Sequence, residues 1–280
     1  MNNHVTTVVV AVSMAVASMS LSAKACAGEV LDRVLAAQTL TVAVGSDWGA
    51  LSHLNDQHEL DGDDVEVAKG IADYLGVKIK FVTPGWDIIQ AGQWGGRWDM
   101  AMGQMTPTND RAKKFAFPAM YFYEGEVAVV HKDSKATKPS DLEGKIVGVR
   151  AGTLGDLYAN HKLTPAWIGA KPIQYQFTAG QVKAYPSANS LTLDDLRLGD
   201  GVRLDGVITE GTTAAAAIKS GYPLKVIGDP LFYAPGAVTI ERGDKEFIDK
   251  VAAAVKKMKD DGTLAKLSVK WFGGDFSVDK

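Results

Sequence analysis

The sequence predicts an α/β protein in which buried strands alternate with amphipathic helices. Short apolar runs that end in glycine or in polar residues recur along the chain, as at 40–45, 78–83 and 145–150. Between them, apolar residues follow helical spacing, as at 29–39 and 65–75. Strand and helix periods that alternate in this way are typical of a sheet covered by helices.

Length and composition allow one large or two medium-sized domains. The chain has 280 residues, of which 46% are hydrophobic and 22% are charged, and its net charge is −3. This is the composition of a soluble globular protein with ample core. No basic face is indicated, so we do not expect nucleic acid as a partner. The histidines show no metal-ligand spacing, and we expect neither a metal site nor a cofactor.

The N-terminal residues 1–27 are predicted to be a secretory signal. Residues 5–21 are small and apolar, and Ala25-Cys26-Ala27 has the small-x-small pattern of a cleavage site. We place cleavage near Ala27, which leaves no cysteine and no thiol chemistry. Two alternatives stay open: an uncleaved membrane anchor, and a lipoprotein cleaved before Cys26.

Residues 98–123 carry the most informative pattern. The apolar run 99–103 reads as a buried strand, and the polar residues Gln104 and Thr106 follow it directly. Pro107 ends the strand. A strand end, a loop and a helix start are therefore expected to bring several short polar side chains together.

Arg111 lies within a few residues of this polar cluster. A guanidinium is planar and can bind both oxygens of a carboxylate at once, so the cluster suits a small carboxylate ligand. On spacing alone the alternative is a surface ion pair of Arg111 with Asp110 or Glu124, since exposed ion pairs are common.

Other candidate residues follow predicted strands. Asp47 and Trp48 come after the first strand, at the edge where open α/β sheets bind ligands. The alternative for Trp48 is packing on the scaffold, which we also expect for Trp86, Trp94 and Trp98.

Two further candidates lie later in the chain. The loop 151–156 is glycine-rich and contains Thr153, and amides at a helix start attract anions. The alternative is an ordinary capped turn. Glu210 ends the strand predicted at 204–210, and its alternative is a surface residue that caps the next helix.

Several of these motifs resemble a known family. The residues G-Q-M-T-x-T-x-x-R at 103–111, F-x-F-P-x-x-Y at 115–121, and the tail D-G-T-L…K-W-F-G at 261–273 resemble periplasmic solute-binding proteins for polar amino acids, the bacterial extracellular solute-binding protein family 3. The resemblance implies a type II periplasmic-binding fold, with two α/β lobes joined by two crossover strands. We expect lobe one at 28–131 plus 230–280 and lobe two at 132–229.

The resemblance also implies a function. A small zwitterion, such as an amino acid, would lie between lobes that close on it like a hinge, and an ABC transporter permease would receive it. Localisation would be periplasmic, the protein would be a monomer, and no enzymatic activity is expected. The ligand-binding residues implied are Arg111, Thr106 and Thr153 for the carboxylate, Gln104 and Glu210 for the ammonium, Trp48 as apolar wall, and Asp47 beside it.

Two alternatives use the same fold. A periplasmic cyclohexadienyl dehydratase, acting on prephenate or arogenate, would use Glu210 as an acid. An accessory protein that binds a partner instead of a solute is the other. The family often has a Pro-Phe pair in the loop where Gly49-Ala50-Leu51 stands here, and an aromatic residue where Asp63 stands. These two departures keep the accessory-protein alternative open.

Overall fold

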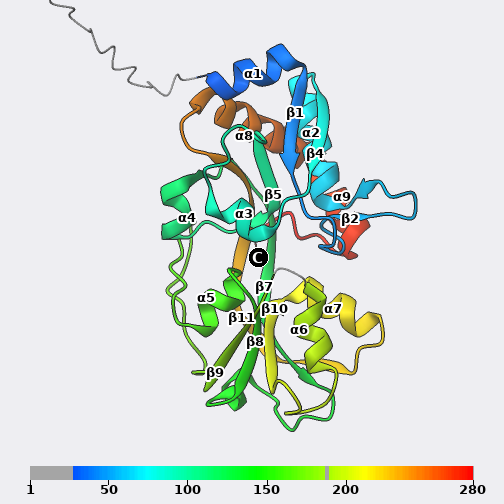
Figure 1. Cartoon of the computed structure of the whole chain (residues 1–280), viewed down its shortest axis with the longest axis vertical. Helices are drawn as coiled ribbons and strands as arrows, with labels where there is room; N and C mark the ends of the chain where they lie inside the picture. Colours follow the sequence, from blue (N-terminus) through cyan, green and yellow to red (C-terminus); the bar gives the residue numbers. More distant parts are fainter. Residues whose placement is uncertain (1–27, 187–188, 280) are drawn as a thin grey trace, which may run out of the picture.

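The computed structural model describes residues 28–186 and 189–279 and has two lobes, stacked along its longest axis (Figure 1). The predicted signal at 1–27, with Cys26, lies outside the described residues. Among the described helices, none is long and apolar enough to cross a membrane.

The elements divide between the lobes as follows. The upper lobe of Figure 1 holds α1 (Glu29–Ala37), β1 (Thr39–Ala43), β2 (His53–Leu54), β3 (Leu60–Asp61), α2 (Asp63–Leu75), β4 (Lys78–Val82), α3 (Trp86–Ala91), β5 (Met100–Met105), α4 (Asn109–Lys114), β6 (Phe115–Ala116), α8 (Lys245–Asp260) and α9 (Thr263–Phe272). The lower lobe holds the 3₁₀ helix η1 (Pro139–Leu142), β8 (Ile146–Arg150), α5 (Leu154–Ala159), β9 (Gln181–Tyr185), α6 (Asn189–Leu196), β10 (Gly206–Glu210) and α7 (Gly211–Lys219). Strands β7 (Met120–His131) and β11 (Leu224–Glu241) run through both.

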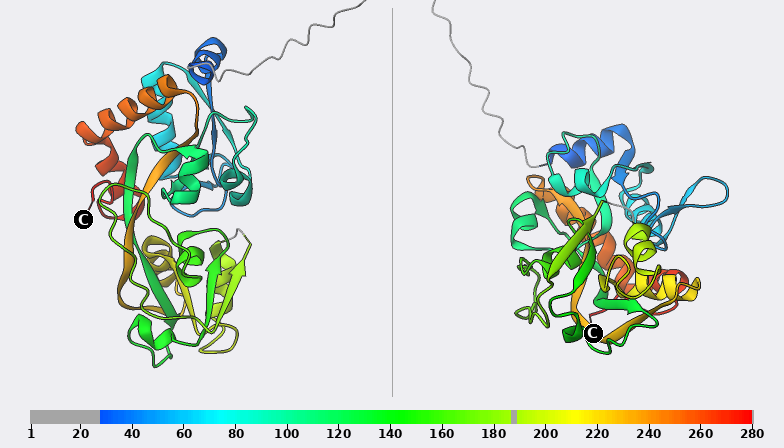
Figure 2. Two further views of the ribbon diagram at one scale, coloured as in Figure 1. Left: turned by 90° about the vertical axis from the view of Figure 1, so that its left-hand side faces the viewer. Right: turned by 60° about the horizontal axis from the view of Figure 1, so that its bottom comes forward.

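One sheet passes through both lobes. Its strand order is β4-β1-β5-β11-β7-β10-β8-β9. The outer strands are parallel to their neighbours within each lobe, whereas β7 and β11 pair antiparallel in the middle. Figure 2 shows these two strands along one side of the molecule, where they link the lobes. The predicted α/β class and the two linking strands are confirmed.

The strand β11 is continuous across the expected lobe boundary at 229/230. It runs as one strand from Leu224 to Glu241. Its pairing with β7 shifts between Ile227 and Phe232, next to Gly228 at φ 64° and Pro230. A positive φ and a missing amide interrupt a ladder without ending the extended chain, so these residues form a bulge.

The pairing of β7 with its neighbours locates the junction of the lobes. Residues Glu126–Val129 of β7 pair with β10 of the lower lobe, and the upper part of β7 pairs with β11 near Tyr123. We propose that the lobes divide near Glu124 and Ala234, which face each other in this ladder.

Each lobe has its own apolar core. In the upper lobe, β1, β5 and the first half of β7 pack against α2 and α8, with Val42, Ile71 and Phe247 fully buried. In the lower lobe, β8 and β10 pack around Tyr158 and Leu204, which are also fully buried. Because the lobes do not share a core, the space between them is free to hold polar groups.

Asp244 offers a test of how the upper lobe is held together. Its Oδ2 accepts hydrogen bonds from the amides of Val30 and Leu31 at the start of α1, at 2.7 and 2.9 Å, and its Oδ1 accepts one from Phe247 in α8. Burial opposes ionisation, but these amides outweigh it and lower the pKa of Asp244. Asp244→Ala should therefore lower the unfolding free energy by about 2 kcal/mol at pH 7.

Urea denaturation measures the change. A carboxyl with a depressed folded pKa stabilises above its unfolded pKa, so the difference between the parent and Asp244→Ala should shrink as the pH falls below 3.8. Asp249→Ala is the matched control, because Asp249 lies on α8 in an exposed pair with Lys245 and should cost less than about 0.5 kcal/mol. Equal losses for the two variants would contradict the capping role.

Candidate ligand-binding site between the lobes

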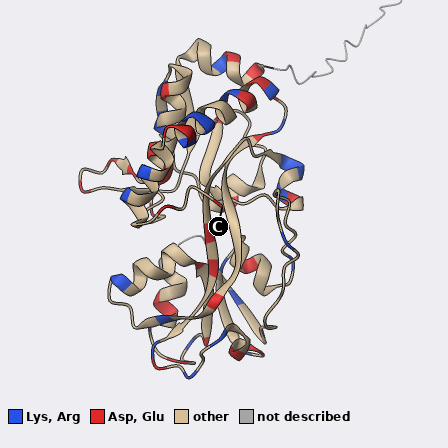
Figure 3. Ribbon diagram, turned by 180° about the vertical axis from the view of Figure 1, so that it is seen from behind, with Lys and Arg blue, Asp and Glu red and all other residues tan. Residues whose placement is uncertain are grey.

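A cavity of about 50 Å³ lies at the junction of the lobes. Both lobes and both linking strands contribute to its lining. The upper lobe supplies Leu51, Trp86, Gly103, Gln104, Thr106 and Arg111; the lower lobe supplies Arg150, Thr153, Leu154 and Glu210; the linking strands supply Phe122, Glu124, Glu126, Ala234 and Gly236. Most other charged residues lie on helices and outer loops, whereas acidic residues colour the middle of a central strand (Figure 3).

Arg111 is buried in this cavity, with 8% of its surface exposed. It lies in the first turn of α4. The hydroxyl of the N-cap residue Thr108 accepts a hydrogen bond from the Arg111 amide. Its guanidinium donates to the carbonyls of Thr106 and Gly152, both at 2.9 Å, and Gly152 belongs to the lower lobe. Burial, with the nearby Arg150 cation, lowers the pKa of Arg111 to about 10, so it stays charged at neutral pH.

The surface ion pair considered for Arg111 is wrong. Asp110 is exposed and pairs instead with Lys113 at 2.6 Å. Glu124 accepts hydrogen bonds from the amide and hydroxyl of Thr212. Arg111 points into the protein instead, where both acceptors of its guanidinium are neutral carbonyls.

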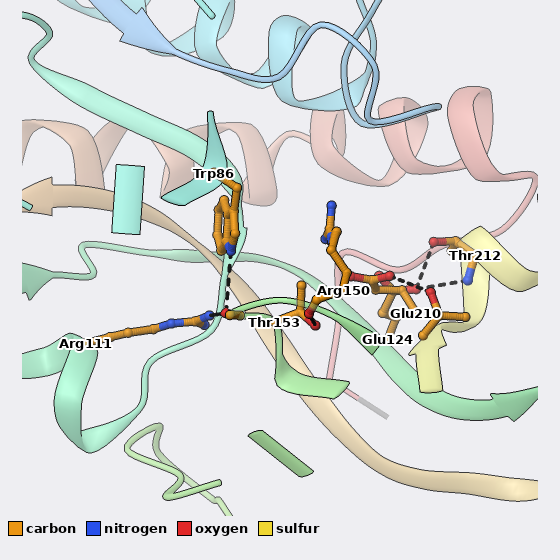
Figure 4. A network of polar contacts seen from close by, with 9 residues as sticks. Trp86, Arg111, Glu124, Arg150, Thr153, Glu210 and Thr212 are labelled. Atoms are coloured by element: carbon orange, nitrogen blue, oxygen red, sulfur yellow. Dashed lines mark hydrogen bonds and ion pairs between the residues drawn. The ribbon is translucent and has the colours of Figure 1, made fainter. Parts of the chain in front are cut away.

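The lobes touch on either side of Arg111. The indole nitrogen of Trp86 lies 3.5 Å from the same Gly152 carbonyl (Figure 4). Near Arg111 in the sequence, the Asn109 amide donates to the Thr164 carbonyl at 3.0 Å, and the Ala166 amide donates to the Pro107 carbonyl at 3.1 Å. The lobes are therefore joined by direct contacts beside the cavity as well as by the linking strands.

Gln104 and Thr106 lie in the cavity wall, at and just past the end of β5. Gln104 has φ 52°, and its amide donates to the Tyr121 hydroxyl at 3.1 Å. Its side-chain Nε2 is buried and has no hydrogen-bond partner among the described residues. The Thr106 hydroxyl donates to the Pro235 carbonyl at 2.7 Å, so it ties the strand end to β11.

Thr153 reaches the cavity from the lower lobe. It is the N-cap of α5 and is 7% exposed. Its hydroxyl donates to the Arg150 carbonyl at 2.7 Å, within its own turn. The glycine-rich loop thus presents Thr153 at the cavity, but the hydroxyl proton is already used.

Glu210 is paired inside its own lobe. Arg150 at the end of β8 donates to Oε1 of Glu210 at 3.0 Å, and the Thr209 hydroxyl donates to Oε2 (Figure 4). Burial alone would raise the pKa of Glu210, but the Arg150 guanidinium and the hydrogen bonds outweigh it and lower that pKa. Glu210 is therefore ionised at neutral pH, and its charge is balanced by Arg150.

Two further carboxylates of the cavity were missed by the sequence analysis. Glu124 and Glu126 lie two residues apart on β7, so both point to the same face as Phe122. Burial, together with the Glu210 charge, raises the pKa of Glu124 to about 8, and it raises that of Glu126 well above its usual value. A pair of acids at alternating positions in a buried strand is the signal that could have identified them.

The aromatic wall is also different from the prediction. Trp48 is buried against Trp86 with ring centroids 5.7 Å apart, but Trp86, predicted as a packing residue, is the one that lines the cavity. A Cβ on Gly45 or Gly103 would lie 2.1 or 2.6 Å from the Trp48 ring, so these glycines let the ring fold beneath the strand ends. Asp47 is exposed and outside the cavity lining.

Charged side chains lie on opposite sides of the cavity. Arg111 approaches from one side, and Arg150, Glu124 and Glu210 lie on the other (Figure 4). Three buried polar atoms in the lining have no partner among the described residues: Nε2 of Gln104, Oε2 of Glu126 and Nε of Arg150. Such an arrangement can bind a small molecule that carries both positive and negative groups.

The chain is similar to proteins of known role. It is 30% identical to the L-cystine-binding protein TcyJ of Escherichia coli over 93% of this chain and 92% of that protein. It is 31% identical to the arginine-binding extracellular protein ArtP of Bacillus subtilis, over 76% and 78% of the two chains. The crystal structure of AncCDT-1, an ancestral amino acid-binding protein and precursor of cyclohexadienyl dehydratase, covers 86% of this chain and 99% of its own, with a TM-score of 0.74 and 30% identity.

The family model points the same way and covers most of both lobes. It describes the bacterial extracellular solute-binding proteins of family 3, and it matches residues 40–274. The matched range includes every residue of the cavity lining. The named relatives above are binding proteins. This chain belongs to the bacterial extracellular solute-binding proteins, family 3.

Proposed function

We propose that the protein binds an amino acid between its lobes, in the periplasm, and delivers it as a monomer to the permease of an ABC transporter. Membership of the family supports solute binding. The relatives named for cystine and arginine favour an amino acid as the solute. The two linking strands allow the lobes to open and close about the cavity.

The observation that carries this proposal is the position of the unsatisfied polar groups. The buried cation of Arg111 and the partnerless atoms of Gln104, Glu126 and Arg150 all line one cavity. Buried polar atoms are costly unless they are paired, and a zwitterion would supply both kinds of partner.

Each end of the ligand would have its own partners. The α-carboxylate would accept hydrogen bonds from the N–H groups of Arg111 that the two carbonyls leave free, beside Thr106 and Thr153. The α-ammonium would lie near Gln104 and Glu210, since a carboxylate oxygen can accept more than one hydrogen bond. Trp86 would form the apolar wall, in place of the predicted Trp48. Asp47 has no part in this arrangement.

Arg111→Lys tests the role of the guanidinium. Lysine keeps the charge but loses the planar pair of donors, so amino-acid affinity should fall by about 2–5 kcal/mol, which is roughly 30- to 5,000-fold. Titration calorimetry measures the affinity, after a thermal-shift screen has identified a solute that raises the melting temperature.

A control variant separates this effect from a general loss of stability. Arg197→Lys changes an arginine on the lower lobe that is half exposed and pairs with Asp194. It should leave the affinity unchanged. An unaltered affinity in Arg111→Lys, with a folded protein, would remove Arg111 from the site.

The dehydratase alternative makes a different prediction. It has some support in the raised pKa of Glu124, about 8, because a carboxyl that holds its proton at neutral pH can act as an acid. The ion pair with Arg150 keeps Glu210 ionised, so Glu210 has no proton to donate as a general acid. We therefore expect no conversion of prephenate or arogenate at pH 7, measured by product absorbance. Turnover that is abolished by Glu210→Gln would establish an enzyme instead.

A further inference from the structure

The carboxylates of the cavity are gathered on one patch of the sheet. Glu124 and Glu126 share a face of β7, and Glu126 lies directly opposite Glu210 in the ladder between β7 and β10. All three line the cavity together with two arginines, Arg111 and Arg150. With every group ionised, the lining carries three negative charges and two positive ones.

The partners of these groups are unevenly distributed. Glu210 has Arg150 at 3.0 Å, and Glu124 has the amide and hydroxyl of Thr212 at 3.1 and 2.9 Å. Glu126 is 4% exposed, and its Oε2 has no hydrogen-bond partner among the described residues. Glu126 is thus the least compensated of the acidic groups, and a buried carboxylate is stable as an anion only beside a cation.

A metal ion does not fit this patch. Among the described residues, no group of three or more His, Cys, Asp or Glu side chains is placed to hold one. The missing positive charge must therefore come from the ligand itself or from protons on the carboxyls.

We propose, on the basis of the proposed amino-acid site, that Glu124 and Glu126 form a subsite for a second cationic group, an ammonium or guanidinium on the side chain of the solute. The α-carboxylate then pairs with Arg111, and the α-ammonium lies near Gln104 and Glu210. A basic amino acid brings two positive charges and one negative charge, which balances the net charge of the lining. A second carboxylate on the solute is disfavoured, because Arg150 is already paired with Glu210.

The subsite couples binding to protons. Burial and the Glu210 charge raise the pKa of Glu124 to about 8, although Thr212 and Arg150 oppose this. Burial, Glu210 and Glu124 raise the pKa of Glu126 well above its usual value, although the two arginines oppose this. At pH 7 the Glu124 carboxyl therefore holds its proton much of the time, and a bound cation favours its ionised form. Binding of a basic solute should release protons, so its affinity should rise with pH up to about 8, by up to about tenfold per unit for each proton released.

Two isosteric pairs of solutes provide the first test. Arginine and citrulline have nearly the same shape, but only arginine has a cationic side chain; lysine and norleucine form a second pair. In titration calorimetry at pH 7, the basic member should bind at least about tenfold more tightly than the neutral one. Repeating the titration in two buffers of different ionisation enthalpy should show proton release for arginine and none for citrulline.

Single substitutions test whether Glu124 and Glu126 cause the preference for a cationic side chain. Glu126→Gln and Glu124→Gln keep the shape of the side chain but remove the charge, so each should reduce the preference for arginine over citrulline and the number of protons released. Asp229→Asn is the matched control, because Asp229 is an exposed acid on β11 outside the lining, and it should change neither.

The outcomes separate the subsite from the function that it rests on. Equal affinity for arginine and citrulline, or tight binding of cystine without binding of arginine, would overturn the subsite and leave amino-acid binding intact. A full preference for arginine in the Glu124→Gln, Glu126→Gln double variant would also overturn it. Failure of the parent protein to bind any of the standard amino acids or cystine would overturn the proposed function itself.

Discussion

The buried guanidinium of Arg111 sets the terms for the space between the lobes. A permanent charge is enclosed there with only neutral carbonyls as acceptors, one from each lobe. An uncompensated charge is costly in a surrounding of low dielectric constant. The other charged side chains of the cavity therefore have to be considered as one group with Arg111. The second arginine neutralises Glu210, and burial raises the pKa of both acids of β7, which favours their neutral forms.

The backbone explains why these groups meet. Strands β5, β8 and β10 end at the junction, so residues just at or past their ends, such as Gln104, Arg150 and Glu210, enter the same space from two lobes. Strand β7 crosses the junction instead of ending there, and it places Glu124 and Glu126 on the floor. The site is thus built from strand ends of both lobes and from one continuous strand that passes between them.

Sequence reasoning anticipated the strand-end residues and missed those inside a strand. Arg111 and Glu210 could be identified because each follows a recognisable buried run. Glu124 and Glu126 lie inside a mostly apolar strand. Two acids at alternating positions indicate a site only if both are assigned to the same face of that strand. Trp48 was expected to line the cavity, but its ring packs beside it. Its position depends on close contact with glycines such as Gly103, which is distant in sequence. Such contacts depend on tertiary packing, which local periodicity does not contain.

The carboxylate of Asp244 joins α1 to α8 in the upper lobe, across more than two hundred residues of chain. During synthesis, the lower lobe has nearly all of its strands before this residue exists, whereas α1 has no cap until the last part of the chain has been made. The upper lobe must therefore stay incomplete while most of the polypeptide is already present. Contacts so distant in sequence slow folding, and here they delay one lobe more than the other.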